Sequence, residues 1–412
     1  MNPYLVIILA ILAGSYILDF IVEKLNVKHI STQLPGEFSG FYSPEKYANS
    51  QSYLKENTNF SLVEDSATLL AVVVFTLAGG FNFVDNFARH FGFGNIPTGL
   101  IFAGIIMLAS EIIDIPFSIY QTFVIEEKYG FNKTTAKTFI MDLIKEWLIS
   151  GIIGALIFSL VLWFFEKTGS MAWVYCWVLV TAFSIFIVFI APVVIMPLFN
   201  KFIPLEEGAL KTAIETFAKE QKFKLSGLFK MDASKRSTKS NAYFTGFGRF
   251  RRIVLFDTLI QKHTVEELVS VLAHEIGHYK KKHIFKSFAV SILTTGLMFY
   301  ILSFFLGNEQ LFAAFKMNNI SIYAGLFFFG FLFTPINLIL SILGNILSRR
   351  HEYEADAFAV ETYKQPEAMI NALKKLSVDN LSNLTPHPLK VFLEYSHPPV
   401  IKRIETIRKS SR

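Results

Sequence analysis

The chain has 412 residues, of which 52% are hydrophobic, 15% aromatic and only 17% charged. Ordinary soluble domains carry about 25% charged residues, so this composition argues against a soluble globular protein. The net charge is +6, and the basic residues gather in loops between apolar stretches, as expected beside anionic lipid. The charge pattern therefore needs no nucleic-acid partner to explain it.

Seven apolar stretches are long enough to cross a membrane as helices. In chain order they cover about 4–22, 67–84, 99–120, 147–165, 172–197, 287–306 and 322–346. The first is expected to be a retained span, because it lacks a basic start and a small-residue cleavage site and ends among the acids Asp19 and Glu23. The single cysteine, Cys176, lies in the fifth stretch and is expected to be a buried, inert thiol.

The loops between these spans alternate in basic content. The loops after spans one, three and five are rich in Lys, whereas those after spans two, four and six hold one basic residue each: Arg89, Lys167 and Lys316. Cytoplasmic loops carry the excess of Lys and Arg. The pattern predicts an N-terminus outside the cytoplasm, with residues 198–286 and the C-terminal tail inside.

This alternation also predicts four parts of the chain. They are residues 1–197 with five spans and two cytoplasmic loops, 198–286 as a first cytoplasmic segment, 287–346 with spans six and seven, and 347–412 as a second cytoplasmic segment; the motifs described next make both cytoplasmic segments candidates for a catalytic role.

Two of the spans carry acids. Glu111 and Asp114 are three residues apart in span three and share a helical face, and Asp19 lies in span one. Ionisable residues are costly inside a membrane and usually face a bundle interior or a wet cavity. Two interpretations stay open: the acids lie near the interface, or they line a hydrated chamber between the helices.

The stretch HTVEELVSVLAHEIGHYKKKH, residues 263–283, predicts a helix that carries a zinc site. Thr264 and Glu267 form a capping-box pattern at its start. His274 and His278, four residues apart, share a face and can bind one tetrahedral Zn²⁺. Glu275, next to the first histidine, can act as general base toward the attacking water. Such a pattern arises by chance on the order of one time in a hundred in a chain with this many histidines.

A catalytic zinc ion usually takes three protein ligands, and the third is expected in SRRHEYEADAFAV, residues 348–360. Glu352 and Asp356 lie four apart on one helical face. Glu352 could bind the metal while Asp356 orients a ligand histidine. His351 and Glu354 compete for the ligand role, and a charged helix start at a membrane surface would look similar, so the local pattern leaves the choice open.

The motifs AHEIGHYKKKH and RRHEYEADAFA together resemble the type I CAAX prenyl proteases, which are integral-membrane zinc metalloendopeptidases. Further segments are similar to that family in the same order along the chain. They are SPEKYANSQSYLKENTNF (43–60), VIEEKYGFNKTT (124–135), SNAYFTGFGRFRRIVLFDTLI (240–260) and YSHPPVIKRI (395–404).

The resemblance implies one zinc ion per chain and a set of active-site residues. The implied zinc ligands are His274, His278 and Glu352, the catalytic base is Glu275, the acid that holds a ligand is Asp356, and the groups that hold the substrate backbone or the oxyanion are Asn241 and His397. The implied fold is an all-α integral membrane protein. Its seven transmembrane helices would form a barrel around a large hydrated chamber, with the zinc metalloprotease subdomain on the cytoplasmic side.

The expected partners are a peptide or protein substrate, with a prenylated C-terminal tail as one candidate, and membrane lipid; an oligomer is not required. The composition, rich in Lys, Ile and Phe, and a tail without a dilysine signal favour a bacterial plasma membrane over the endoplasmic reticulum, the expected membrane in a eukaryote. In a bacterium a prenylated natural substrate is not expected, and the alternative is quality control of membrane proteins, as in the HtpX-like proteases.

Two other classes of protein were weighed against a protease. A transporter with a structural zinc site would need a fourth protein ligand, which is hard to name here. A catalytically inactive receptor or scaffold is at odds with the intact Glu275.

Overall fold

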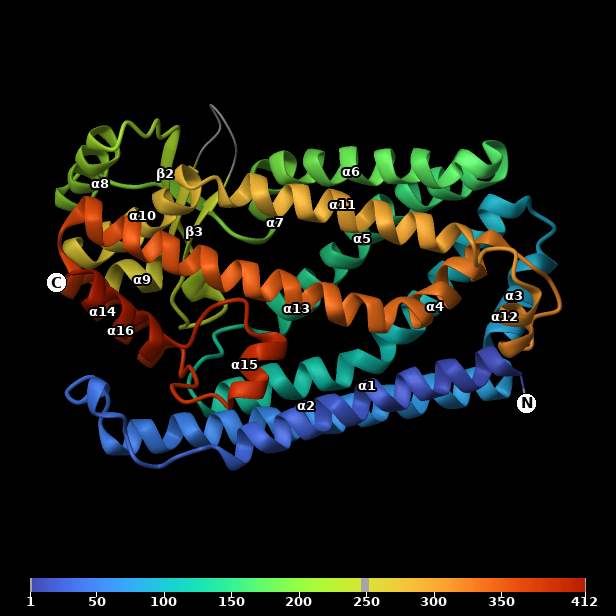
Figure 1. Ribbon diagram of the computed structural model, residues 1–412, viewed down its shortest axis with the longest axis horizontal. Coiled ribbons are helices and arrows are strands. Elements are labelled where there is room, and N and C mark those ends of the chain that lie inside the picture. Colours follow the sequence, from blue (N-terminus) through green and yellow to red (C-terminus); the bar gives the residue numbers. More distant parts are fainter. Residues whose placement is uncertain (1, 246–251, 412) are drawn as a thin grey trace.

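The computed structural model describes residues 2–245 and 252–411, and Figure 1 shows an elongated, mostly helical molecule. Within these ranges seven helical segments are long and apolar enough to cross a membrane. They are α1 (Pro3–Lys28), α2 (Pro44–Ala78), α4 (Asn95–Tyr120) with its π-helical continuation η2 (Gln121–Glu126), α5 (Ala136–Lys167), the segment Gly169–Phe199, α11 (His283–Ser303) and α13 (Ile322–Tyr363). The segment Gly169–Phe199 joins η3 (Gly169–Met171), α6 (Ala172–Ile190), η4 (Ala191–Ile195) and α7 (Met196–Phe199).

Each helical segment corresponds to one predicted span, but the predicted ends of the second and sixth spans are wrong; the sixth was expected to reach residue 306, and α11 ends at Ser303. The apolar pattern extends to residue 84, whereas α2 ends at Ala78 because Gly79 adopts the left-handed conformation, with φ 79°. The residues that follow form a separate helix, α3 (Gly80–His90). α2 also begins far before its apolar part, at Pro44, where the hydroxyl of Ser43 accepts a hydrogen bond from the amide of Lys46 and caps the helix.

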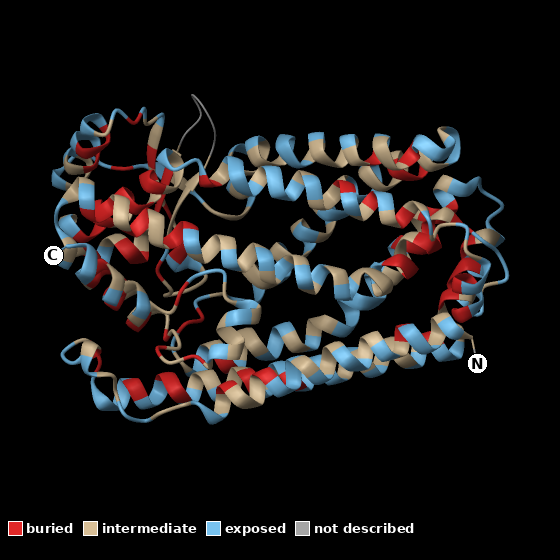
Figure 2. Cartoon of the chain, in the orientation of Figure 1, coloured by how far each residue is buried: buried red, intermediate tan, exposed pale blue. Residues whose placement is uncertain are grey.

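The membrane helices pack in a closed ring. Going around it, α1 contacts α2, α2 contacts η2, α4 contacts α5, α5 contacts α6, α6 contacts α11, α11 contacts α13, and α13 contacts α1. α13 also contacts α4 and α5, so the helices converge on one side of the ring. At most 11% of any apolar helix window is buried, and Figure 2 shows this as long exposed stretches. The ring is therefore a barrel around a chamber, as the resemblance implied.

The end of the barrel near the N-terminus is closed by packed aromatic rings. Here α3 and α12 (Glu309–Ala314) lie beside the ends of the membrane helices (Figure 1). Tyr323 of α13 packs on Phe102 of α4, with ring centroids 5.3 Å apart. Its hydroxyl donates to the carboxylate of Asp85 of α3, which also pairs with Arg89 at 2.9 Å. In the wall of the barrel, Cys176 is fully buried, as predicted.

The opposite end carries a small sheet that the sequence analysis did not predict. Its strands are β1 (Phe202–Pro204), β2 (Gly227–Met231), β3 (Ala242–Thr245) and β4 (Arg252–Phe256), in the order β1-β2-β4-β3. β2 and β4 are parallel, and the other two pairs are antiparallel. The helical class holds for the rest of the described chain, and the strands lie within residues 202–256.

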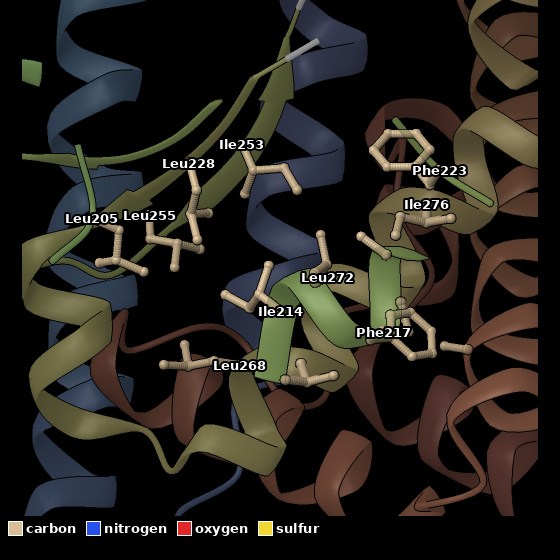
Figure 3. Packing of buried hydrophobic residues seen from close by; sticks show 14 of the residues in the cluster. Leu205, Ile214, Phe217, Phe223, Leu228, Ile253, Leu255, Leu268, Leu272 and Ile276 are labelled. Carbon is tan, nitrogen blue, oxygen red and sulfur yellow. The ribbon is translucent and has the colours of Figure 1, made fainter. Parts of the chain in front are cut away.

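One face of this sheet is covered by helices α8 (Ala209–Glu220) and α10 (Val265–Lys280), with a buried apolar cluster between them (Figure 3). Leu228 and Leu255 come from the sheet, Ile214 from α8, and Leu268 and Leu272 from α10. Elements η5 (Ala233–Lys235), α9 (Asp257–Lys262), α14 (Pro366–Asp379), α15 (Pro388–Glu394) and α16 (Val400–Ser410) complete this end, and η1 (Gly36–Phe38) lies after α1.

The ends of the molecule at which the loops lie agree with the alternation of basic loops in the sequence. In Figure 1 the N-terminus, α3 and α12 lie toward one end of the molecule, and α8, α10 and the C-terminus toward the other. The loops after spans one, three and five therefore share the end that carries α10, where the basic residues are concentrated. That this end faces the cytoplasm stays a prediction, as do the four parts of the chain.

Candidate metal centre

The site is built where α10 crosses the C-terminal half of α13. α10 begins at the predicted capping box: Thr264 and Glu267 exchange hydrogen bonds between side chain and backbone. A β-carbon on Gly277 would lie 3.1 Å from the backbone of Ala355. A residue without a side chain is needed there because the two helix backbones nearly touch. Ala273, one turn earlier, is fully buried.

This close approach brings three potential ligand side chains together. The Nε2 atoms of His274 and His278 are 3.0 Å apart. Glu352 of α13 places Oε2 3.5 Å from Nε2 of His274 and Oε1 3.2 Å from Nε2 of His278. In a tetrahedral zinc site with bonds of about 2.0–2.1 Å, two ligand atoms lie about 3.3 Å apart. The donor set thus fits Zn²⁺ in both chemistry and spacing. In the described residues it is the group of three or more His, Cys, Asp or Glu side chains that could hold a metal ion.

The two other candidates for the third ligand, Glu354 and His351, contact other side chains instead of the metal position. Glu354 accepts hydrogen bonds from Arg350 and pairs with His283, both at 3.0 Å. The ring of His351 stacks on that of His283, with centroids 4.0 Å apart. Neither side chain belongs to the three-residue metal group, so the geometry favours Glu352.

Asp356 lies behind His274 and is itself held by Arg403 of α16. Oδ1 of Asp356 is 2.8 Å from Nδ1 of His274, which leaves Nε2 of that ring for the metal. Arg403 donates two hydrogen bonds to Asp356, at 2.8 and 2.6 Å, and its Nη1 is 3.2 Å from Oε2 of Glu352. A bidentate pair of this kind fixes both partners in one orientation.

The charges around His274 shift its pKa. Burial favours the neutral ring, but hydrogen bonds to Asp356 and Glu352 outweigh burial and raise the pKa of His274 to about 9. Burial likewise opposes the charge on Arg403, yet the adjacent Asp356 carboxylate raises the pKa of Arg403 above its usual range. The metal-free site therefore favours a proton on His274 and holds the Arg403 guanidinium against its two carboxylates, and a bound metal ion would displace that proton.

A cavity of about 800 Å³ opens beside the three ligand side chains. Glu275, half-buried, lines it, and so do Asn241 and His397. Nε2 of His397 lies 3.5 Å from Oε1 of Glu352, and 64% of the His397 side chain is exposed. Asn241 stands directly before β3, an outer strand of the sheet, and its Oδ1 accepts a hydrogen bond from the amide of Ala242. All the predicted site residues except Asp356 thus border one cavity.

Two family models match the chain in tandem. Residues 24–201 match the model described as the CAAX prenyl protease N-terminal region, with five membrane helices, and residues 204–411 match peptidase family M48. The chain belongs to peptidase family M48. It is accordingly a membrane-embedded metallopeptidase, and the resemblance inferred from its motifs is confirmed.

Relatives of this peptidase cover almost its whole length. The CAAX prenyl protease 1 homolog of Oryza sativa subsp. japonica is 36% identical over 98% of this chain and 97% of its own length. The homolog of Homo sapiens is 33% identical, over 94% and 91%, and CAAX prenyl protease 1 of Saccharomyces cerevisiae is 34% identical, over 94% and 91%. The crystal structure of S. mikatae Ste24p matches with a TM-score of 0.94 and 33% identity, covering 99% of both chains.

The sequence analysis of this M48 peptidase missed Arg403, which contacts Asp356 and Glu352. A signal was present. Arg403 stands next to Ile404 in the apolar pattern of Ile404 and Ile407, which placed it at the edge of the buried face of α16. Of the family-like segment 240–260, residues 246–251 lie outside the described residues.

Proposed function

We propose that this peptidase is a zinc endopeptidase that cleaves flexible C-terminal tails of membrane-associated proteins, including lipidated tails of the CAAX type. The observation that carries the proposal is the tetrahedral spacing of His274, His278 and Glu352 on the wall of a cavity that also holds Glu275. Three protein ligands leave one position for water, as in catalytic zinc sites, whereas structural sites use four. This difference favours an enzyme over a transporter with structural zinc.

The bound zinc ion would polarise the scissile carbonyl and lower the pKa of the attacking water. The protein's own side chains would do the rest. Glu275, as general base, would take the proton of the water and pass it to the leaving amine. Asp356 and Arg403 would hold the ring of His274 so that Nε2 stays directed at the metal.

Asn241 and His397 are assigned to the substrate. The Oδ1 atom of Asn241 is used by the amide of Ala242, so its amide nitrogen is the atom left to donate to a substrate oxygen. The exposed ring of His397 lies on the cavity wall beside Glu352. A donor aimed at the developing oxyanion typically contributes about 3–4 kcal/mol. Both residues are therefore placed to stabilise the oxyanion or to hold the peptide backbone.

The substrate class follows from the barrel and from the relatives. A chamber enclosed by a ring of helices would admit an extended segment and exclude a folded domain. The relatives described above are named CAAX prenyl proteases, and a prenylated tail would reach the chamber from the membrane. These relatives are eukaryotic; the bacterial plasma membrane, the cytoplasmic side of the site and the quality-control role stay predictions.

The test is a cleavage assay on the purified protein in lipid. The substrates are one flexible peptide with a prenylated C-terminal Cys-a-a-X tail, the same peptide without the lipid, and a folded soluble protein. We expect zinc-dependent cleavage of the peptides, faster for the prenylated one, and products identified by mass spectrometry. Cleavage of the folded protein at a similar rate would contradict the enclosed chamber, and no cleavage of any peptide by the zinc-loaded protein would overturn the proposal.

A further inference from the structure

The second ligand histidine is held differently from the first. Nδ1 of His278 lies 3.0 Å from Nδ1 of His283, and Nε2 of His283 lies 3.0 Å from Oε2 of Glu354. His283 is buried, with 2% of its surface exposed. A row of three side chains thus extends from the proposed metal position to a carboxylate at the edge of the site, beyond the residues already given a role.

The proton positions along this row are fixed by its two ends. If Nε2 of His278 binds the metal, its Nδ1 must carry the proton and donate it. Nδ1 of His283 must then accept, so Nε2 of His283 carries the other proton and donates to Glu354. Every nitrogen and oxygen in the row has a role in this assignment, and the opposite assignment would place a proton on the nitrogen of His278 that faces the metal.

The backbone places His283 there by a tight turn. α10 ends at Lys280, and α11 begins at His283. Lys282 between them has φ 59°, the left-handed conformation that costs a non-glycine residue about 1 kcal/mol. The chain therefore passes from α10 to α11 within two residues, and His283, the first residue of α11, contacts His278 in the last turn of α10. Arg350 holds the far end of the row through Glu354 at 3.0 Å.

A neighbouring histidine provides the contrast. His351 stacks on His283 with an angle of 9° between the rings, and it is also buried, with 4% exposed. Its buried Nε2 has no hydrogen-bond partner within the described part of the chain. His351 therefore packs against His283 without joining the row, so the two buried rings differ in hydrogen bonding while sharing the same stack.

We propose that His283 is a positioning residue that fixes the tautomer and the ring orientation of His278, with Glu354 as the carboxylate behind it. The proposal rests on the proposed zinc site. Asp356 does for His274 directly what Glu354 does for His278 through an intervening ring. Partners of this kind usually change metal affinity 10- to 100-fold when removed.

The test compares two substitutions in the same stack, His283→Phe and His351→Phe. Each keeps a planar ring, but only the first removes a hydrogen bond to a ligand. Zn²⁺ affinity is measured by competition with a chelator on the metal-free full-length protein, and the Co²⁺-loaded protein gives a d–d absorption spectrum that reports ligand geometry. We expect His283→Phe to weaken Zn²⁺ binding about 10- to 100-fold and to alter the Co²⁺ spectrum. His351→Phe should leave both unchanged.

A third variant distinguishes the loss of the hydrogen bond in His283→Phe from a failure of that variant to fold. His283→Asn places an oxygen acceptor near the former Nδ1 and should restore most of the affinity lost in His283→Phe. Equal affinity of His283→Phe and the parent protein would overturn the proposal, and so would equal losses in His283→Phe and His351→Phe or a failure of Asn to rescue. If the parent protein itself binds no Zn²⁺ through His274 and His278, the proposed function fails instead, and the two results are distinct.

Discussion

The end of the molecule that carries α10 and the membrane ring are held together in different ways. Nine of the 16 residues of α10 are buried, whereas at most 11% of any apolar window in the ring is buried. The first region resembles the core of a soluble protein and is stabilised by the hydrophobic effect. The ring has lipid on one side and the chamber on the other, so few of its apolar residues are enclosed by protein. The proposed zinc site, which needs accurate geometry, thus lies in the packed region. The open ring would give the substrate access to it.

The largest effect should come from Glu275, which is proposed to act as general base and does not hold the metal. Glu275→Gln keeps His274, His278 and Glu352, so we expect zinc to stay bound. Turnover should fall about 10²- to 10⁴-fold, because the amide cannot accept the proton of the attacking water. Metal analysis beside a peptide-cleavage assay measures both quantities. Normal turnover with bound zinc would remove Glu275 from the mechanism.

The next effect concerns the third ligand. Glu352→Ala should release zinc at micromolar metal concentrations, because two histidines alone leave the site without its buried carboxylate. Glu354→Ala is the matched control in the same helix. It removes only the residue behind His283, so a 10-fold loss of affinity, with full occupancy at saturating zinc, is the expected limit. Zinc loss in the control and retention in Glu352→Ala would reverse the two assignments.

A pair of apolar truncations tests the contrast between the two regions itself. Leu272 of α10 is 2% exposed, and Ile152 of α5 is 70% exposed. Leu272→Ala should cost about 2–5 kcal/mol of unfolding free energy because it opens a cavity in a packed core. Ile152→Ala should cost less than about 0.5 kcal/mol. Thermal unfolding of both variants in the same detergent gives the comparison, and equal losses would show that the ring is packed as tightly as the core.

Features that depend on neighbouring residues in the chain are the ones that the sequence predicts well. Apolar length alone gives the seven spans, and the HExxH spacing places His274 and His278 because both features are local. The boundary at Gly79 escaped the apolar pattern because Phe81, Phe83 and Val84 continue that pattern, although the pair Gly79 and Gly80 was a local signal of a break. The sheet was not predicted because its strands are three to five residues long, which is too short to show an alternation of apolar and polar residues. Arg403 and His283 act through contacts with distant parts of the chain or across a turn, which spacing does not encode.

The last comparison concerns the pH dependence of the metal-free site. The pKa of His274 is raised to about 9 in the folded protein and is about 6.5 in an unfolded chain. Between these values the folded state binds more protons, so this contribution to stability is fully present below pH 6.5 and is lost as the pH rises toward 9. The melting temperature of the metal-free protein should therefore fall over this range.

Zinc should reverse the sign of that dependence, because the metal displaces the proton on His274. Affinity for Zn²⁺ should rise by up to about tenfold per pH unit between pH 6.5 and 9, as expected when one proton competes with the metal. Asp356→Asn is the control: it keeps the shape of the carboxylate but removes the charge that raises the pKa of His274. In that variant the decline in melting temperature should end at a lower pH. A metal-free parent protein whose melting temperature stays constant or rises from pH 6.5 to 9 would contradict the charge arrangement around His274, and with it the ion pairs through which Asp356 and Arg403 are proposed to hold the ligand.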